Sequence, residues 1–371
     1  MTSPSPQAPG PAGPITTPLT KLLGIRHPIL LAGMARTSTG ALAAAVSNAG
    51  GLGVVGGFMY TPSQLRSIIK DLKSLLSSPD LPFGVDLALP QVGGSARRTN
   101  HDYTGGRLDE LVDVAIEGGA RLFVSAVGVP PRRIVDRLHA SGVLVMNMVG
   151  APRHAAKALD LGVDMVCAQG GEGGGHTGDV SSTVLVPAVV DVAGGCAPPP
   201  LLNRLLGTSG TPPLVVAAGG ICDGRTLASS LALGASGVWV GTRFVASLEA
   251  GCSDEHKDEV VSAGFESTQR TLVLSGRPLR MKTNEYIREW HEQREGEMKD
   301  LMAKGIVPIE HDLEKGGRDV DLPHLMGQVA GRISKVQPAG EIVREMVEEA
   351  VRVLKVGNSY LNSEDAGKSK L

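Results

Sequence analysis

Eight short runs of apolar residues, many of them β-branched, recur along the first two-thirds of the chain, and each precedes a helix-forming segment. The runs are continuous in hydrophobicity, which is typical of strands covered on both faces. Strict alternation of strand and helix predicts parallel strands joined by right-handed crossovers. Eight such units are the number in a closed (β/α)8 barrel, so we predict an α/β chain with a TIM barrel. The runs cover residues 28–32, 53–56, 83–89, 121–127, 143–149, 163–169, 214–218 and 237–240.

A doubly wound open sheet is the alternative architecture. It predicts a dinucleotide-binding glycine fingerprint in the first strand-to-helix turn. That turn, residues 32–40, reads AGMARTSTG and lacks the fingerprint. Glycines gather instead after the sixth, seventh and eighth runs, where barrels commonly bind phosphate. We therefore favour the barrel.

The rest of the chain divides by composition. Residues 1–18 are rich in proline and predict a disordered arm before a barrel over residues 19–255. Charged helical segments predict a helical cap or subdomain over residues 256–357. Residues 358–371 read as a flexible tail that ends in Ser369-Lys370-Leu371. This ending matches the address read by the peroxisomal import receptor, so we predict a peroxisomal location, or a cytoplasmic one without import.

Overall composition favours a small-molecule partner. The net charge of -2 and the 3% aromatic content indicate neither the excess of basic residues nor the aromatic stacking residues that binding of nucleic acid requires. No apolar run reaches the roughly 18 residues that a membrane-spanning helix needs. The four cysteines form no CxxC pair and no HExxH motif occurs, so the sequence predicts no metal site.

A glycine-rich stretch follows the sixth run. Residues 163–180 read VDMVCAQGGEGGGHTGDV, with five glycines around Glu172 between Gln169 and His176. Such density indicates unusual backbone torsions or a flat ligand lying against the backbone. His176 is the candidate proton acceptor, because imidazole titrates near neutral pH. Glu172 either orients the loop or the imidazole, or is a surface carboxylate.

Glycines also end the seventh and eighth runs. Gly219-Gly220 after Ala218, and Gly241-Thr242, could bring backbone N–H groups and helix N-termini to an anion, although tight packing turns are the alternative. Gln169 could hydrogen-bond the edge of a heterocycle or merely end its strand. Asp86 could reach the same rim, or it could be a solvated or helix-capping carboxylate.

Six segments carry a family resemblance. In order they are PILLAGM, ALAAAVSNAGGLG, PFGVDL, AQGGEGGGHTG, PLVVAAGGICDGRTLASSLALGASGVWVGTRF and MKTNEYIREW. Together they resemble the nitronate monooxygenase family, formerly called 2-nitropropane dioxygenases. The resemblance implies an FMN-binding barrel that oxidises alkyl nitronates with O2 to carbonyl compounds and nitrite, with His176 as the catalytic base. It places FMN contacts on Gly33, Met34, Asp86, Gln169, Gly174, Ala218, Gly219, Gly220, Gly241 and Thr242.

Three positions depart from the family pattern. Asp86 stands where the family usually has asparagine, Gly173 replaces an alanine, and Asn147-Met148 occupy a place where some relatives carry a lysine. Two other functions fit the same motifs. One is an NAD(P)H-dependent flavin reductase with a quinone or enoyl-thioester acceptor. The other is a non-redox barrel that binds a phosphorylated ligand.

Overall fold

The protein is described by a computed structural model that covers residues 12–94, 96–316, 320 and 323–362. Eight parallel strands form one sheet in the order β1-β9-β8-β6-β5-β4-β3-β2. β1 also lies next to β2, because Leu52 N donates to Ile29 O and Leu31 N donates to Leu52 O, each at 2.9 Å. The predicted barrel is confirmed, and all eight predicted runs are strands. They are β1 (Ile29–Leu31), β2 (Gly53–Gly56), β3 (Phe83–Ala88), β4 (Leu122–Ala126), β5 (Leu144–Val149), β6 (Met165–Gln169), β8 (Leu214–Ala218) and β9 (Gly237–Val240).

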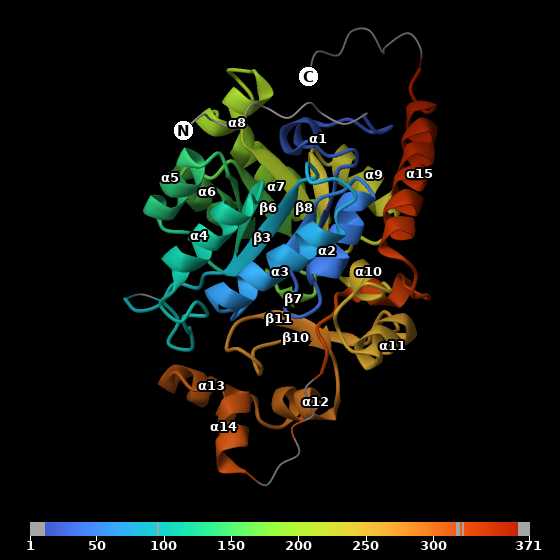
Figure 1. The fold of residues 1–371 in the computed structure, drawn as a ribbon. Helices are drawn as coiled ribbons and strands as arrows, with labels where there is room; N and C mark the ends of the chain where they lie inside the picture. Colours follow the sequence, from blue (N-terminus) through green and yellow to red (C-terminus); the bar gives the residue numbers. More distant parts are fainter. Residues whose placement is uncertain (1–11, 95, 317–319, 321–322, 363–371) are drawn as a thin grey trace.

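Both faces of the barrel strands are buried, which explains their continuous hydrophobicity. Alternate side chains point inward and meet leucines of two short helices, α1 (Pro18–Leu23) and α8 (Pro200–Leu206). Arg121, just before β4, donates to Leu22 O at 2.8 Å, so α1 covers the end of the barrel where strands begin. Figure 1 shows α1 and α8 at this end and the small sheet of β7, β10 and β11 at the other. The end of the barrel where the strands finish is therefore the end at which a binding site can form.

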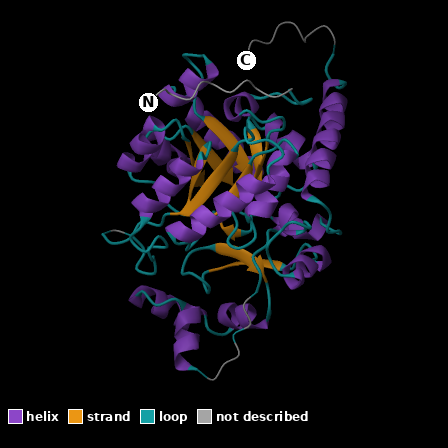
Figure 2. Cartoon of the chain, in the orientation of Figure 1, coloured by secondary structure: helices purple, strands orange, loops and turns teal. Residues whose placement is uncertain are grey.

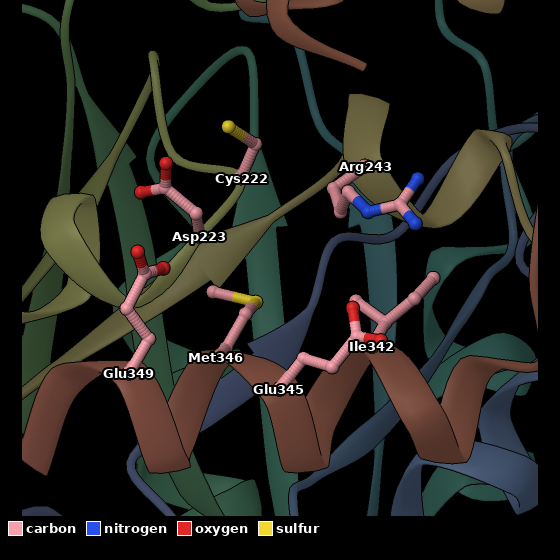
Figure 3. A pocket seen from close by; sticks show the side chains of 7 residues that line it. All are labelled: Cys222, Asp223, Arg243, Ile342, Glu345, Met346 and Glu349. Atoms are coloured by element: carbon pink, nitrogen blue, oxygen red, sulfur yellow. The ribbon is translucent and has the colours of Figure 1, made fainter. Parts of the chain in front are cut away.

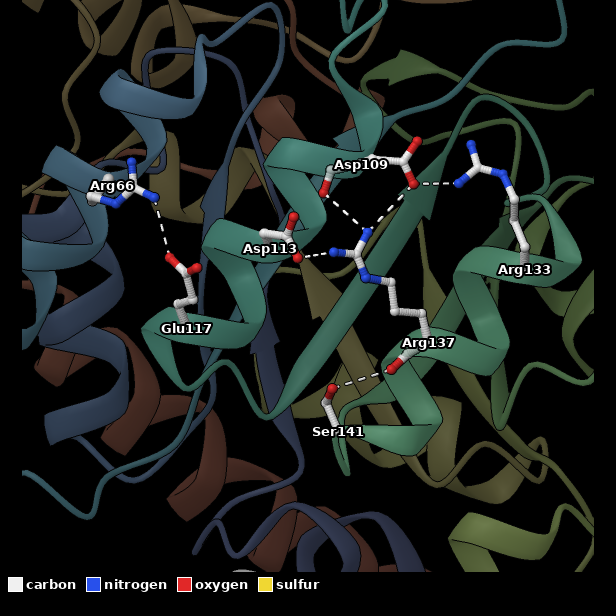
Figure 4. Close-up of polar contacts among 7 residues, drawn as sticks. All are labelled: Arg66, Asp109, Asp113, Glu117, Arg133, Arg137 and Ser141. Carbon is white, nitrogen blue, oxygen red and sulfur yellow. Dashed lines mark hydrogen bonds and ion pairs between the residues drawn. The ribbon is translucent and has the colours of Figure 1, made fainter. Parts of the chain in front are cut away.

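Helices surround the barrel and cover the outward-facing side chains. α3 begins at the predicted cap, because the Thr61 hydroxyl accepts from Gln64 N while the Gln64 side chain accepts from Thr61 N. On the surface, Arg133 and Arg137 of α5 pair with carboxylates of α4 (Figure 4), and such exposed pairs contribute little stability. The helices that follow β1 to β8 are α2 (Gly40–Asn48), α3 (Pro62–Leu75), α4 (Leu108–Gly118), α5 (Arg132–Ala140), α6 (Pro152–Asp160), α7 (Ser182–Gly194) and α9 (Gly224–Ala232).

The last barrel helix comes from the end of the chain. β9 is followed only by α10 (Thr242–Val245), whereas α15 (Ala339–Asn358) packs against α9 and α2. Its buried side chains include Ile342, Val343 and Met346, which join the outer core of the barrel. The segment 339–357, predicted as part of the cap, therefore packs as a barrel helix. The domain boundaries otherwise stay a prediction.

The chain between α10 and α15 forms a smaller unit, most of which lies below the barrel in the view of Figure 2. α11 (Asp254–Ser262) precedes an antiparallel hairpin, β10 (Thr268–Thr271) and β11 (Leu279–Lys282), which pairs with β7 (Gly175–His176). Three helices then form a second core together with the hairpin around the fully buried Trp290, over which Arg294 stacks at 3.5 Å. They are α12 (Glu285–Glu292), α13 (Glu295–Lys304) and α14 (Pro308–Lys315), and the 3-10 helix η1 (Gln328–Arg332) leads back toward the barrel. The predicted C-terminal helices are confirmed, and the hairpin is an addition to them.

The two ends of the chain are only partly described. Residues 1–11 of the predicted arm and residues 363–371, with Ser369, Lys370 and Leu371, lie outside the described residues. For residues 12–18 the prediction of disorder is wrong. Ile15 is buried in the core, and Thr17 Oγ1 donates to Ser236 O at 2.7 Å. Within the described ranges, no helix combines the length and the apolar composition that crossing a membrane requires.

Candidate active site

The predicted cofactor-binding residues meet at the end of the barrel where strands β1, β3, β6, β8 and β9 finish. Gly33 lies against Asp86, since a Cβ on this glycine would come within 2.3 Å of Asp86 Oδ2. A Cβ on Gly241 would lie 3.5 Å from Met34 Sδ, and Gln169 is the register partner of Ala218. The fold therefore brings together residues that lie far apart in the sequence.

His176 stands at the rim on β7, where it pairs with Leu279 of β11. Its Nε2 lies 2.9 Å from Ser275 Oγ, and the Gln169 amide donates to the His176 carbonyl at 3.1 Å. Burial, and then the positive charge of Arg277, lowers the pKa of His176 to about 4. The imidazole is therefore neutral at physiological pH, with a lone pair able to take a proton. Sequence reasoning missed Ser275, because a single serine 99 residues away carries no local signal.

The glycine-rich loop is held by the chain itself. Glu172 accepts from Ser182 N and Ser182 Oγ at 3.0 Å, so this carboxylate orients the loop at the start of α7. Cβ atoms on Gly170, Gly173 and Gly174 would collide with protein atoms, for example Ser182 N at 2.6 Å from the position on Gly170, whereas Gly175 has open space and a φ of 72°. A Cβ on Gly173 would lie 2.6 Å from Gln169 Nε2. Close packing of the chain, not only a flat ligand, thus explains the glycines.

A C-terminal segment, residues 323–328, lies against the loop, and we call it the strap. Gly327 N donates to Thr242 Oγ1 at 3.0 Å, and Gln328 N donates to Glu172 O at 3.0 Å. A Cβ on Gly174 would lie 2.7 Å from Gly327 N. Gly174 therefore packs on the strap, and its predicted contact with a cofactor stays a prediction. Because Thr242 Oγ1 only accepts in this contact, its hydroxyl hydrogen remains able to donate.

The two glycine turns have different surroundings. Gly219 and Gly220 adopt φ values of 91° and 73°, which L side chains rarely adopt, and a Cβ on Gly220 would meet no atom of the described residues closer than 3.8 Å. The space beside Gly220 is thus open to a ligand, whereas Gly219 packs against Gly170. Gly241 meets only ordinary contacts. These turns remain candidates for a phosphate cradle.

The start of α9 does not contribute to that cradle. Asp223 accepts from Thr226 N at 2.9 Å, and Glu349 of α15 accepts from Gly224 N at 2.8 Å. The protein's own carboxylates therefore occupy this helix N-terminus, and the expectation that it binds phosphate is wrong. Both carboxylates line a cavity of about 80 Å³ (Figure 3). This volume is too small for a flavin.

Asp86 provides a test of whether a flavin fits. Its carboxyl group is buried, and Oδ1 has no hydrogen-bond partner within the described ranges. Burial raises the pKa of Asp86 to about 8, so the group is neutral at pH 7 and carries an O–H donor. Buried polar atoms in native proteins normally have partners. A heteroatom of a ligand at the barrel mouth would supply one, and the residues present therefore fit a flavin.

Comparison with known proteins agrees with this geometry. Residues 16–349 match the sequence model of the family described as "Nitronate monooxygenase". An octahydroindene-carboxyl-CoA dehydrogenase of Mycobacterium tuberculosis is 34% identical over 74% of this chain and 68% of its own. FabK of Thermotoga maritima is 32% identical, with a TM-score of 0.72 over 94% of this chain and 100% of its own. A nitroalkane oxidase of Streptomyces ansochromogenes is 25% identical, with a TM-score of 0.71 over 92% and 99%. This chain therefore belongs to the nitronate monooxygenase family of flavin-dependent oxidoreductases.

Proposed function

We propose that this protein binds FMN at the open end of the barrel and oxidises alkyl nitronates with O2 to carbonyl compounds and nitrite. The observation that carries the proposal is the neutral imidazole of His176, held at the rim between Gln169 and Ser275. Family membership supports the flavin, and the nitroalkane oxidase relative supports the substrate class.

The chain supplies the binding groups for FMN, which when bound accepts the electrons that the substrate loses. The backbone at Gly219-Gly220 and Gly241, with the Thr242 hydroxyl, would hold the phosphate. The neutral carboxyl group of Asp86 and the Gln169 carbonyl oxygen would meet polar atoms of the ring system. The proposed FMN-binding residues are Gly33, Met34, Asp86, Gln169, Gly174, Ala218, Gly219, Gly220, Gly241 and Thr242.

His176 acts as the base in this proposal. When the neutral nitroalkane enters the site, the neutral imidazole can take a proton from the carbon that bears the nitro group, which produces the nitronate, and it holds that proton while the nitronate is oxidised. The contact between Nε2 and Ser275 Oγ fixes the ring, and the bond from Gln169 fixes the backbone of β7. A low pKa keeps the His176 imidazole neutral at neutral pH but also makes it a weak base. The position of the imidazole therefore matters more for the proton transfer than its basicity.

Substitution of His176 by asparagine tests the base. We expect His176→Asn to keep its yellow colour and FMN content while kcat with nitroalkane falls about 100- to 10,000-fold. His154→Asn, on the exposed face of α6, is the matched control and should behave like the wild type. An unchanged kcat/KM in His176→Asn would refute the assignment.

An NAD(P)H-dependent flavin reductase is the second candidate. It is favoured by FabK, which is 32% identical to this chain, whereas the nitroalkane oxidase is 25% identical. Anaerobic mixing decides between them. Rapid bleaching of the flavin by NADH or NADPH, with none by propyl-2-nitronate, would establish the reductase. The third hypothesis, a non-redox barrel, requires a colourless preparation that FMN cannot reconstitute.

Peroxisomal import stays a prediction that rests on Ser369, Lys370 and Leu371 alone. The relatives described above come from bacteria, which have no peroxisomes, and so give it no support. A fluorescent fusion tests the prediction directly. Import that depends on Leu371 would support it, and punctate import without Leu371 would contradict it.

A further inference from the structure

Arg277 is a half-buried cation in the turn between β10 and β11. Its guanidinium donates to Asn100 Oδ1 at 2.9 Å and to the Val127 carbonyl at 2.7 Å, and both acceptors are neutral. Its electrostatic neighbours are Arg97 and Tyr103, and within the described ranges no carboxylate pairs with it. Loss of solvent and the charge of Arg97 lower the pKa of Arg277.

A half-buried cation without a carboxylate partner lacks the opposite charge that usually offsets its lost hydration. Buried charges are normally paired with an opposite charge, because carbonyl dipoles replace only part of the lost hydration. Two other arginines have such partners: Arg294 binds Asp312 at 2.9 Å, and Arg270 binds Asp179 at 2.7 Å. Arg121, Arg243 and Arg280 bind neutral oxygen atoms, as Arg277 does, so Arg277 differs from them by its place near His176. Arg277 therefore has the charge and the spare N–H groups to bind an anion that comes from outside the chain.

This cation lies beside the proposed base. Ser275, two residues earlier in the same turn, contacts His176 Nε2, and its hydroxyl lies 3.4 Å from the Arg277 carbonyl. The charge of Arg277 is also one cause of the lowered pKa of His176. The base, the hydroxyl and the cation thus share one corner of the barrel mouth.

The loop between β3 and α4 holds Arg277 in this position through residues 99 and 100. Asn100 binds the guanidinium and also donates to Gln91 O at 2.6 Å. Thr99 packs so tightly on the turn that a Cβ on Gly276 would lie 2.4 Å from its hydroxyl. This loop between β3 and α4 therefore becomes part of the site.

The strained backbone of Val127 indicates that the Arg277 guanidinium is held in a specific position. Val127 follows β4 with φ of 68°, a left-handed value that is costly for a β-branched residue. Such backbone strain persists only where the surroundings hold it, and it is concentrated at binding sites. Here the bond from Arg277 to the Val127 carbonyl is one of the contacts that holds it.

We propose that Arg277 binds an oxyanion of the substrate and so makes this site selective for anions. The inference rests on the proposed function and adds the residue that recognises charge. The oxyanion is either the nitronate group itself or a carboxylate elsewhere on the same substrate. Both present oxygen atoms that a guanidinium can bind through two N–H groups.

Anion binding to the FMN-loaded protein tests the proposal without turnover. Nitrite and acetate are titrated while the visible spectrum of the bound flavin is followed, with neutral acetone as the comparison. We expect Arg277→Gln to raise the Kd of nitrite about 10- to 100-fold, as loss of a charge-assisted hydrogen bond predicts. Arg277→Lys should recover part of this affinity, because the charge remains but the two-pronged geometry is lost. Arg66→Gln, an exposed arginine of α3, is the control.

Kinetics separates the two sources of the oxyanion. If the nitronate group is bound, KM for propyl-2-nitronate rises in Arg277→Gln and KM for neutral 2-nitropropane does not. If a carboxylate is bound, only nitronates that carry a carboxylate show the change. In both cases the acid limb of the pH profile should move to higher pH, because removing the cation raises the pKa of His176.

Three outcomes would overturn the inference, and they differ from a failure of the proposed function. The first is an unchanged Kd for both nitrite and acetate in Arg277→Gln. The second is an equal loss for neutral and anionic substrates. Where Arg277→Gln fails to fold, Asn100→Ala leaves the arginine but removes its support, and an unchanged anion affinity there is the third. A protein that binds no FMN would instead refute the proposed function.

Discussion

Substitution of Asp86 by asparagine tests whether this buried carboxyl group is neutral. Burial raises its pKa from 3.8 to about 8, and among the described residues Oδ1 has no hydrogen-bond partner. Its neighbours in the sheet register are Gly56 and Val124, neither of which titrates, and the buried Cys167 thiol is the titratable group coupled to it. Asparagine has nearly the same shape and does not ionise.

The direction in which stability changes with pH follows from the protons that Asp86 binds in the folded and unfolded states. Between about pH 4 and pH 8 the unfolded chain has an ionised Asp86, whereas the folded protein keeps the proton. Stability therefore falls as pH rises through this window and levels off above pH 8. One pKa unit corresponds to about 1.4 kcal/mol, so the free energy of unfolding at pH 7 is lower by up to about 4 kcal/mol than without this titration. Asp86→Asn should recover this amount at pH 7 and almost nothing at pH 4.

Thermal unfolding at pH 5, 6, 7 and 8 measures the effect in preparations with matched flavin content. For a chain of this size, about 4 kcal/mol corresponds to a shift of roughly 4–8 °C in Tm. We expect the advantage of Asp86→Asn over the wild type to grow from pH 5 to pH 8. Asp80→Asn, at an exposed carboxylate, is the control. Parallel curves for Asp86→Asn and wild type across this range would refute the reasoning.

Two further substitutions test the loop and its partners. Gly174→Ala places a Cβ 2.7 Å from Gly327 N, so we expect it to displace the strap, to lower the free energy of unfolding by about 1–3 kcal/mol and to weaken FMN retention. Gly194→Ala is the control, because its Cβ meets no described atom within 4 Å. Equal melting temperatures for the two variants would contradict the expected displacement. Ser275→Ala removes the partner of His176 Nε2, and a loss of about 1 kcal/mol predicts a roughly fivefold lower kcat with FMN binding intact; a kcat equal to that of wild type would show that the ring needs no such support.

Features with a local signal were predictable from the sequence. The eight barrel strands are marked by runs of five or so apolar residues, because both faces of a parallel strand must be buried. The start of α3 is marked by Thr61-Pro62, since capping depends on neighbouring residues. The meeting of Gln169 with the glycine turns at one end follows from the barrel topology, which places all strand ends together.

Features that depend on distant residues needed the tertiary structure. No local pattern shows that α15 covers the barrel next to α9, because an amphipathic helix does not specify its partner. The same holds for Glu349, which occupies the α9 N-terminus that the sequence assigned to phosphate. A single hydrogen bond between residues more than 100 positions apart carries no local periodicity.

The sequence by itself therefore determined the barrel, and it predicted both the end of the barrel for the site and His176 as the proton acceptor. Only the tertiary structure decided the protonation states and the neighbours of the side chains at this end. Burial keeps Asp86 protonated and His176 neutral, and the returning chain places Ser275 and Arg277 beside His176. The reason is that solvent exclusion and charge depend on every element packed around a group, whereas a strand depends mainly on its own residues.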